Sequence, residues 1–348
     1  MSIMTVCGET TKEELGKTSA HEHLLIELRM LVDEPDNARQ NGFYEKLELS
    51  NRYRVYSDPY ALLDNAVLDD ERIATAEMKS FYAAGGRTAV DVTLDEIGRR
   101  PEVLKRISEA SGVRIIMGCG HYIDGALPAS VRTANAETLA DEMVRDLTVG
   151  VRDTGIKAGV IGEIGTSKAP TADEKKVLTA AGIAQLKTGA GIHVHTSLYE
   201  RNGLWATDRL KEMGVPADKI CIDHVDVKLQ PDYIEAILDK GAYVEFDNFG
   251  KEFYLFPRPG GILTERFAYD LERARLISYL CKRGYADKIL LANDICLKSM
   301  LRAYGGQGYA HIMTTVPAML AEAGVTDTDI ERMLTVNAGN FMDIREAS

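Results

Sequence analysis

Six ionisable residues of the chain have types and spacing suited to binding metal ions. Each lies within, or at the end of, a short apolar run of the kind that forms a buried β-strand. They are His21, His23, Glu163, His195, His224 and Asp294. Neutral imidazole and carboxylate oxygen are good ligands for zinc, manganese, iron and cobalt. The pattern therefore indicates a buried site for divalent cations.

His21 and His23 form a His-x-His pair in the first of these runs. Side chains alternate between the two faces of a strand, so the two imidazoles point to one side and Glu22 points to the other. Such a pair can hold one ion, although surface strands also produce His-x-His by chance. His21 and His23 indicate a metal site only in combination with the other four candidate ligands.

Glu163 and Asp294 interrupt apolar runs, where an unpaired carboxylate would be costly to bury. A metal ion would satisfy both carboxylates, and the alternatives are a helix N-cap or a salt bridge. His193 shares the parity of His195 and lies two residues earlier. We assign His193 to packing or to support of the metal ligands.

The elements that must position these side chains are eight short runs rich in apolar and β-branched residues. They cover residues 19–26, 88–93, 114–118, 159–164, 191–196, 220–225, 242–247 and 289–294. Segments between them, such as 68–84 and 171–188, have helical spacing. This alternation predicts a TIM-type (β/α)8 barrel, formed by residues 1–348 as a single domain. An open doubly wound sheet is the alternative, but no strand precedes a G-x-G-x-x-G turn.

In such a barrel, the carboxyl ends of the strands meet at one mouth, where the active sites of TIM barrels lie. All six candidate ligands would converge there. The segment 29–59 is polar and long for a loop after the first strand. It is either a lid over the site or an ordered surface excursion.

Composition narrows the classes of partner. An apolar fraction of 45% with 27% charged residues is ordinary for a globular enzyme. The formal charge of −12 is spread along the chain without a basic stripe, so nucleic acid is not expected as a partner.

The N-terminus does not resemble a signal peptide and no apolar run has membrane-spanning length, so we expect a cytoplasmic protein without membrane contact. Five widely spaced cysteines fit reduced thiols.

Several short words resemble the phosphotriesterase-related branch of the amidohydrolase superfamily, over nearly the whole chain. The words are Ala20-His21-Glu22-His23-Leu24, Val90-Asp91-Val92-Thr93, Ile97-Gly98-Arg99, Ile161-Gly162-Glu163-Ile164-Gly165, His195-Thr196, Asp223-His224, Glu245-Phe246-Asp247, Asn293-Asp294 and Tyr304-Gly305-Gly306-Gln307-Gly308-Tyr309. The resemblance implies one metal on His21, His23 and Asp294, a second metal on His195 and His224, and Glu163 as the bridge. Phosphotriesterase proper has a carboxylated lysine at the position of Glu163, so the chain is similar to the glutamate-bridged subgroup. The resemblance also implies a homo-oligomer, with a dimer as the expected form.

The expected chemistry is hydrolysis with two divalent metal ions, of which Zn²⁺ is the first choice and Mn²⁺, Fe²⁺ and Co²⁺ are alternatives. A hydroxide bridging the metals would attack the carbonyl of a small ester, lactone or amide, with Asp294 as ligand and general base. Phosphotriester hydrolysis and a non-catalytic, small-molecule-binding barrel are the other hypotheses.

Five residues after the third, seventh and eighth predicted strands are candidates for binding the substrate. They are Tyr122, Lys251, Tyr254, Lys298 and Arg302. Their hydroxyl and cationic groups would suit a small anionic molecule. Relatives that hydrolyse phosphorylated sugar lactones resemble the chain at Lys251, but they have an arginine where this sequence has Leu297.

Overall fold

Eight parallel strands form the centre of the computed structural model, which describes residues 2–198, 200–252, 254–255 and 265–344. Neighbouring strands pair in chain order: β3 (Lys17–Glu22), β6 (Gly86–Asp91), β7 (Arg114–Cys119), β8 (Val160–Gly165), β9 (Ile192–His195), β10 (Ile220–Ile222), β11 (Tyr243–Phe246) and β14 (Ile289–Leu291). The two ends of the sheet meet where the Asp294 N–H donates to the His21 carbonyl, 3.2 Å away. The predicted TIM-type barrel is confirmed.

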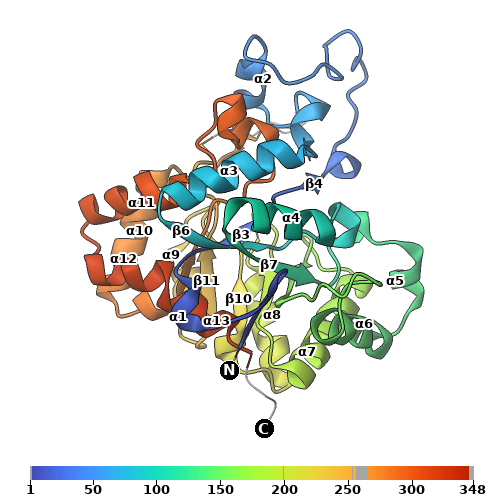
Figure 1. Cartoon of the computed structure of the whole chain (residues 1–348), viewed down its shortest axis with the longest axis vertical. Coiled ribbons are helices and arrows are strands. Elements are labelled where there is room, and N and C mark those ends of the chain that lie inside the picture. Colours follow the sequence, from blue (N-terminus) through green and yellow to red (C-terminus); the bar gives the residue numbers. More distant parts are fainter. Residues whose placement is uncertain (1, 199, 253, 256–264, 345–348) are drawn as a thin grey trace.

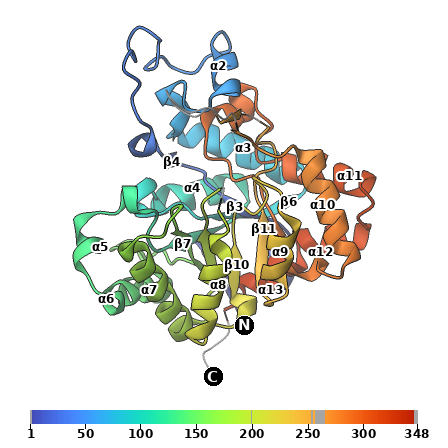
Figure 2. The same ribbon diagram turned by 180° about the vertical axis from the view of Figure 1, so that it is seen from behind.

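Helices surround the sheet, as Figures 1 and 2 show from opposite sides. They are α3 (Glu71–Ala83), α4 (Pro101–Ser111), α5 (Ala129–Thr133), α6 (Ala136–Thr148), α7 (Ala172–Thr188), α8 (Asn202–Glu212), α9 (Pro231–Leu238), α10 (Asp270–Lys282), α11 (His311–Glu322) and α12 (Asp327–Leu334). The predicted helical segments 68–84 and 171–188 correspond to α3 and α7. Thr171 and Glu174 cap the start of α7 reciprocally, and Gly189 ends it in the left-handed conformation with φ 74°. Among the described residues, no helix is both long and apolar enough to cross a membrane.

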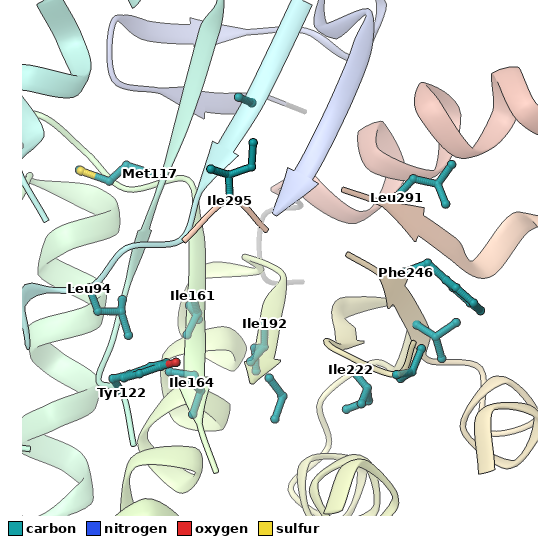
Figure 3. Packing of buried hydrophobic residues seen from close by; sticks show 14 of the residues in the cluster. Leu94, Met117, Tyr122, Ile161, Ile164, Ile192, Ile222, Phe246, Leu291 and Ile295 are labelled. Carbon is teal, nitrogen blue, oxygen red and sulfur yellow. The ribbon is translucent and has the colours of Figure 1, made fainter. Parts of the chain in front are cut away.

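Strand side chains alternate between two apolar regions. Those facing the helices, including Ile161, Ile192 and Phe246, belong to the large outer core and are drawn in Figure 3. Those facing inward, including Ile116 and Leu290, form a separate cluster inside the barrel. Period-two alternation thus places one set against the helices and the other on the barrel axis.

The end of the barrel that carries both chain termini is closed by short elements (Figure 1). The hairpin of β1 (Ile3–Thr5) and β2 (Gly8–Thr10) is followed by α1 (Lys12–Leu15), and α13 (Val336–Met342) lies near them. Ile3, Leu15 and Phe341 pack into the inner apolar cluster. This end is a sealed core, so a site inside the barrel must open at the opposite end.

The long segment after the first barrel strand is an ordered excursion above the opposite end (Figure 1). It contains β4 (Ile26–Glu27), α2 (Arg52–Ser57), β5 (Val67–Leu68) and two 3-10 turns, η1 (Arg29–Leu31) and η2 (Leu63–Ala66). Leu47, Val55 and Leu62 form a small core of their own. Arg52 anchors the segment to the barrel by donating to the Tyr304 carbonyl at 2.7 Å. Movement of this segment as a lid stays a prediction.

Two further strands, β12 (Tyr254–Leu255) and β13 (Glu265–Arg266), pair in antiparallel fashion after β11.

Candidate active site

The structure brings all six predicted ligands together at the open end of the barrel, around Glu163. One carboxylate oxygen of Glu163, Oε2, lies 2.8 Å from His195 Nδ1 and 3.5 Å from His224 Nε2. The other oxygen, Oε1, lies 3.3 Å from His23 Nε2. His21 Nε2 lies 3.6 Å from Oε2, so Glu163 contacts histidines of both implied sets: His23 through Oε1, and His21, His195 and His224 through Oε2.

Asp294 completes the set that contains His21 and His23. Its Oδ1 lies 3.2 Å from His23 Nε2 and 3.8 Å from His21 Nε2. Its Oδ2 forms an ion pair with the ammonium of Lys251. Asp294 Oδ2 also lies 3.9 Å from His224 Nδ1, so the structure brings the six groups together, and their division between two ions stays a prediction.

The backbone turns two of these residues into the mouth after their strands have ended. Strands β10 and β14 end at Ile222 and Leu291, three residues earlier than the runs 220–225 and 289–294 predicted. His224 has φ 61° and Asp294 has φ 46°, both in the left-handed region that non-glycine residues seldom adopt. Conformations of this kind are costly and gather at functional sites. The predicted strand ends were wrong because periodicity cannot show where φ changes sign.

Charge pairing decides the protonation of the site. Burial alone would lower the pKa of His23, but hydrogen bonds to Asp294 and Glu163 raise that pKa to about 10. Burial would raise the pKa of Glu163, but His195 and the other imidazoles hold it well below its usual range. Several imidazoles thus face the Glu163 carboxylate. Metal cations could balance its charge as well as protonated imidazoles do.

The donor set fits two metal ions. His21, His23 and Glu163 form one group of ligand atoms within 4.8 Å of one another, and Glu163, His195 and His224 form a second such group. His21 Nε2 is buried and has no hydrogen-bond partner in the described part of the chain. A buried, unpartnered imidazole nitrogen aimed at two carboxylates is the arrangement a metal ion would complete.

Buried acceptors fix the orientation of the ligands. Asp247 accepts from the His224 N–H at 2.9 Å and lies 3.1 Å from His224 Nδ1. Glu22, on the other face of β3, accepts from the N–H groups of Asn293 and Ile295 on either side of Asp294. Asp247 could have been predicted, because an acidic residue at the end of an apolar strand raises the same question as Asp294. Glu22 can accept from Asn293 and Ile295 only because the barrel closes between its first and last strands. No local sequence pattern reveals that closure.

A cavity of ≈ 150 Å³ lies above the six residues. Its polar wall includes Tyr122, whose hydroxyl lies 3.4 Å from His195 Nδ1, and Lys251. Most of the remaining wall is apolar: Ile26, Leu28, Leu31, Pro59, Leu198, Phe267 and Leu297. The site therefore offers a small, largely apolar chamber over a charged floor.

The predicted substrate-binding residues separate into two groups. Tyr122 and Lys251 line the cavity, whereas neither Lys298 nor Arg302 belongs to its wall as far as the structure describes it. Lys298 Nζ instead donates to Asp64 at 2.7 Å. The backbone of Tyr254 lies in β12, but its side chain is outside the described residues. Contact of Lys298, Arg302 or Tyr254 with substrate stays a prediction.

Tyr60 is a cavity residue that sequence reasoning missed. It comes from the excursion, together with Pro59 and Leu31. Its hydroxyl makes no hydrogen bond within the described part of the chain, and burial raises its pKa above the usual value. No signal in the sequence connects Tyr60 to residues more than a hundred positions away.

Comparisons with known proteins agree with this geometry. The family described as the Phosphotriesterase family matches residues 1–342. A phosphotriesterase-related protein of Nematostella vectensis is 35% identical over 98% of this chain and 98% of its own length. An N-acetyltaurine hydrolase of Dictyostelium discoideum is 32% identical, again over 98% of both chains.

A solved structure, that of a resiniferatoxin-binding protein from Rhodobacter sphaeroides, has the same fold with a TM-score of 0.94. It is 34% identical, and the match covers 98% of this chain and 95% of that one. The family match spans the barrel strands and every predicted ligand. The prediction of a phosphotriesterase-like hydrolase is confirmed, and the chain belongs to the phosphotriesterase family.

Proposed function

We propose that the chain is a hydrolase with two divalent metal ions that cleaves a small carboxylic ester, lactone or amide. The observation that carries the proposal is Glu163, whose carboxylate lies between His21 and His23 on one side and His195 and His224 on the other, beneath one cavity. His21, His23 and Asp294 would hold one ion, His195 and His224 the other, and Glu163 both. Zn²⁺ is the first candidate, because the donors are imidazole and carboxylate.

The residues of the chain supply positioning and proton transfer. When bound, the two cations would supply Lewis acidity that polarises the substrate carbonyl and lowers the pKa of water at the site. Asp294 is ionised, because Lys251 and the imidazoles hold its pKa below the usual value in spite of burial. Its carboxylate would accept the proton of water as the new C–O bond forms. It would then return that proton to the departing oxygen or nitrogen as the old bond breaks.

The cavity wall narrows the class of substrate. Seven apolar side chains surround a space of ≈ 150 Å³, and Lys251 is the cation in the wall that the described residues form. A cavity of about this volume accommodates a group of roughly benzene size. We infer a substrate with a small apolar group and one polar or anionic group within reach of Lys251. An N-acyl amide of a small acid, as in the relative named N-acetyltaurine hydrolase, has the second feature.

The first test is metal content per chain by elemental analysis, for wild type and for Glu163→Ala. The expected result is near two ions in the wild type and loss of one or both in the variant. The same preparations are assayed on lactones, alkyl esters, N-acyl amino acids, N-acyl sulfonates and a phosphotriester. Highest kcat/KM on a carbonyl substrate supports the proposal.

Two results would change the proposed function. A preference for the phosphotriester would move the reaction to phosphorus. Wild-type protein without metal after reconstitution, together with tight binding of small apolar molecules, would indicate a binding barrel. The predicted dimer is a separate prediction, checked by sedimentation equilibrium.

A further inference from the structure

A polar layer lies inside the barrel directly beneath the candidate metal site. Its members are His21, His193, Asp223 and Glu245, all with 0% exposure. Two residues earlier on β10 and β11, Cys221 and Tyr243 belong to the inner apolar cluster. Inward-facing side chains of TIM barrels are usually bulky and apolar. The presence of His193, Asp223 and Glu245 beside His21, where apolar side chains are usual, therefore needs a physical explanation.

The contacts of this layer converge on the ring nitrogen of His21 that points away from the metal site. Glu245 Oε2 lies 3.2 Å from His21 Nδ1, and Asp223 Oδ2 lies 3.6 Å from it. His193 Nδ1 lies 3.1 Å from Asp223 Oδ1 and 3.2 Å from Glu245 Oε2. His21 thus connects the two levels: its Nδ1 faces Glu245 and Asp223, with Asp247 Oδ2 3.7 Å away, and its Nε2 faces Glu163 and Asp294.

With Asp223 and Glu245 both ionised, the layer carries a net negative charge whenever His21 is a metal ligand. A ligating imidazole is neutral and keeps its Nδ1–H for Glu245. His193 is then the one remaining group of the layer that can be cationic, and it faces two carboxylates. In the described part of the chain, no lysine or arginine forms an ion pair with Asp223 or Glu245. A buried net negative charge is expensive unless a nearby cation compensates it.

The metal site would carry the opposite imbalance. Two divalent cations outweigh the carboxylates of Glu163 and Asp294, which leaves a net positive charge in a buried place. The negative layer lies one imidazole ring away. Each level supplies the charge that the other requires.

On the basis of the proposed function, we propose that Glu245, supported by Asp223 and His193, is a positioning residue that holds His21 as a neutral, Nδ1-protonated ligand and supplies counter-charge to the ion that His21 binds. The effect is confined to one ion of the pair. Glu245 contacts His21 and His193, whereas His224 is supported by Asp247, which also lies 3.7 Å from His21 Nδ1.

The test is a Zn²⁺ competition titration of Glu245→Gln against a calibrated chelator. The amide keeps the size of the side chain and removes its charge. One ion is expected to bind about 10- to 100-fold more weakly than in wild type, the usual effect of removing a partner of a ligand. The second ion keeps its affinity. The rise in melting temperature that Zn²⁺ gives, measured against the metal-free form of each protein, should be smaller in the variant than in wild type.

Glu77→Gln is the matched control. Glu77 is also buried, and it accepts from the backbone N–H of Ala303, away from the metal site. Both ions should keep their affinity in this variant. Glu245→Asp, which retains the charge at a shorter reach, should weaken the ion less than Glu245→Gln does. If Glu245→Gln does not fold, Asp223→Asn gives the same readout with a smaller expected loss.

Three results would overturn the inference. One is Glu245→Gln binding both ions as tightly as wild type, and another is equal weakening of both. The third is a third ion in the wild type that disappears in Glu245→Gln, because the layer would then bind metal itself. Wild type without any metal would overturn the proposed function together with this inference, whereas the first three results leave the proposed function standing.

Discussion

The two halves of the barrel interior are both largely buried but chemically opposite. Toward the end that carries the termini, the inward side chains are apolar, including Val90, Ile116 and Leu290. Toward the open end, the same strands and the turns after them present ionisable groups such as His21 and Glu163, which are buried, and His195, whose side chain is 15% exposed. Burial therefore does not distinguish the half that stabilises the barrel from the half that can react.

The difference teaches how one set of strands serves both purposes. Full burial of an aliphatic side chain contributes about 1.5–3 kcal/mol, so the apolar half stabilises the fold. The ionisable half costs desolvation energy and depends on pairing or on metal ions. Because side chains alternate along a strand, a one-residue slip in register would exchange inward and outward sets in both halves. The apolar half thereby holds the ligands of the other half in place.

Asp294→Asn should show most strongly that activity depends on the ionisable half of the barrel interior. The amide keeps the shape of the carboxylate but cannot accept the proton, so kcat should fall by at least about 10²- to 10⁴-fold, the usual contribution of a general base. Steady-state kinetics on the best substrate of the panel, with metal content measured in parallel, provide the check. Activity within tenfold of wild type would remove Asp294 from proton transfer.

Ile116→Ala should have the opposite signature. Removing a fully buried aliphatic side chain in a packed layer lowers the free energy of unfolding by about 2–5 kcal/mol. The kcat of the folded enzyme at low temperature should stay at the wild-type value, because the ligands lie in the other half. Thermal unfolding and kinetics of the same preparation test both statements. A large loss of kcat with unchanged stability would break the division between the halves.

Strand periodicity predicted the barrel and the convergence of the ligands because both depend on local alternation and on barrel closure. The same reasoning failed for the ends of β10 and β14, where left-handed backbone at His224 and Asp294 turns the chain. Glu245 was readable in principle, since it is an acidic residue inside the apolar strand β11. Its parity with Asp247 places it on the inner face.

Strand periodicity could not predict which residues form the wall of the cavity. Lys298 follows the last barrel strand in the expected position, yet its partner is Asp64 on the excursion. Tyr60 reaches the cavity from the same excursion. Contacts between loops that are distant in sequence follow from packing of the whole chain, and hydrophobic periodicity carries no information about them.

Lys251→Met and Lys298→Met compare a cation in the cavity wall with one outside it. A hydrogen bond to a charged group contributes about 1.5–3 kcal/mol, so Lys251→Met should raise KM for an anionic substrate by about 10- to 100-fold. Lys298→Met should leave KM unchanged, because Lys298 is not among the described residues that line the cavity. Neutral esters should respond less than anionic ones to Lys251→Met. Equal effects of the two variants would place Lys298 at the substrate after all.

Tyr60→Phe extends the comparison from the strands to the excursion. The Tyr60 hydroxyl in the cavity wall, which makes no hydrogen bond among the described residues, can donate to substrate, and a neutral hydrogen bond contributes about 0.5–1.5 kcal/mol. KM should therefore rise about two- to tenfold while kcat stays nearly constant. Tyr53→Phe, on the same excursion but 73% exposed, is the control and should change neither parameter. An unchanged KM in Tyr60→Phe would mean that the excursion contributes only apolar surface, so that every polar contact with substrate comes from the ends of the barrel strands.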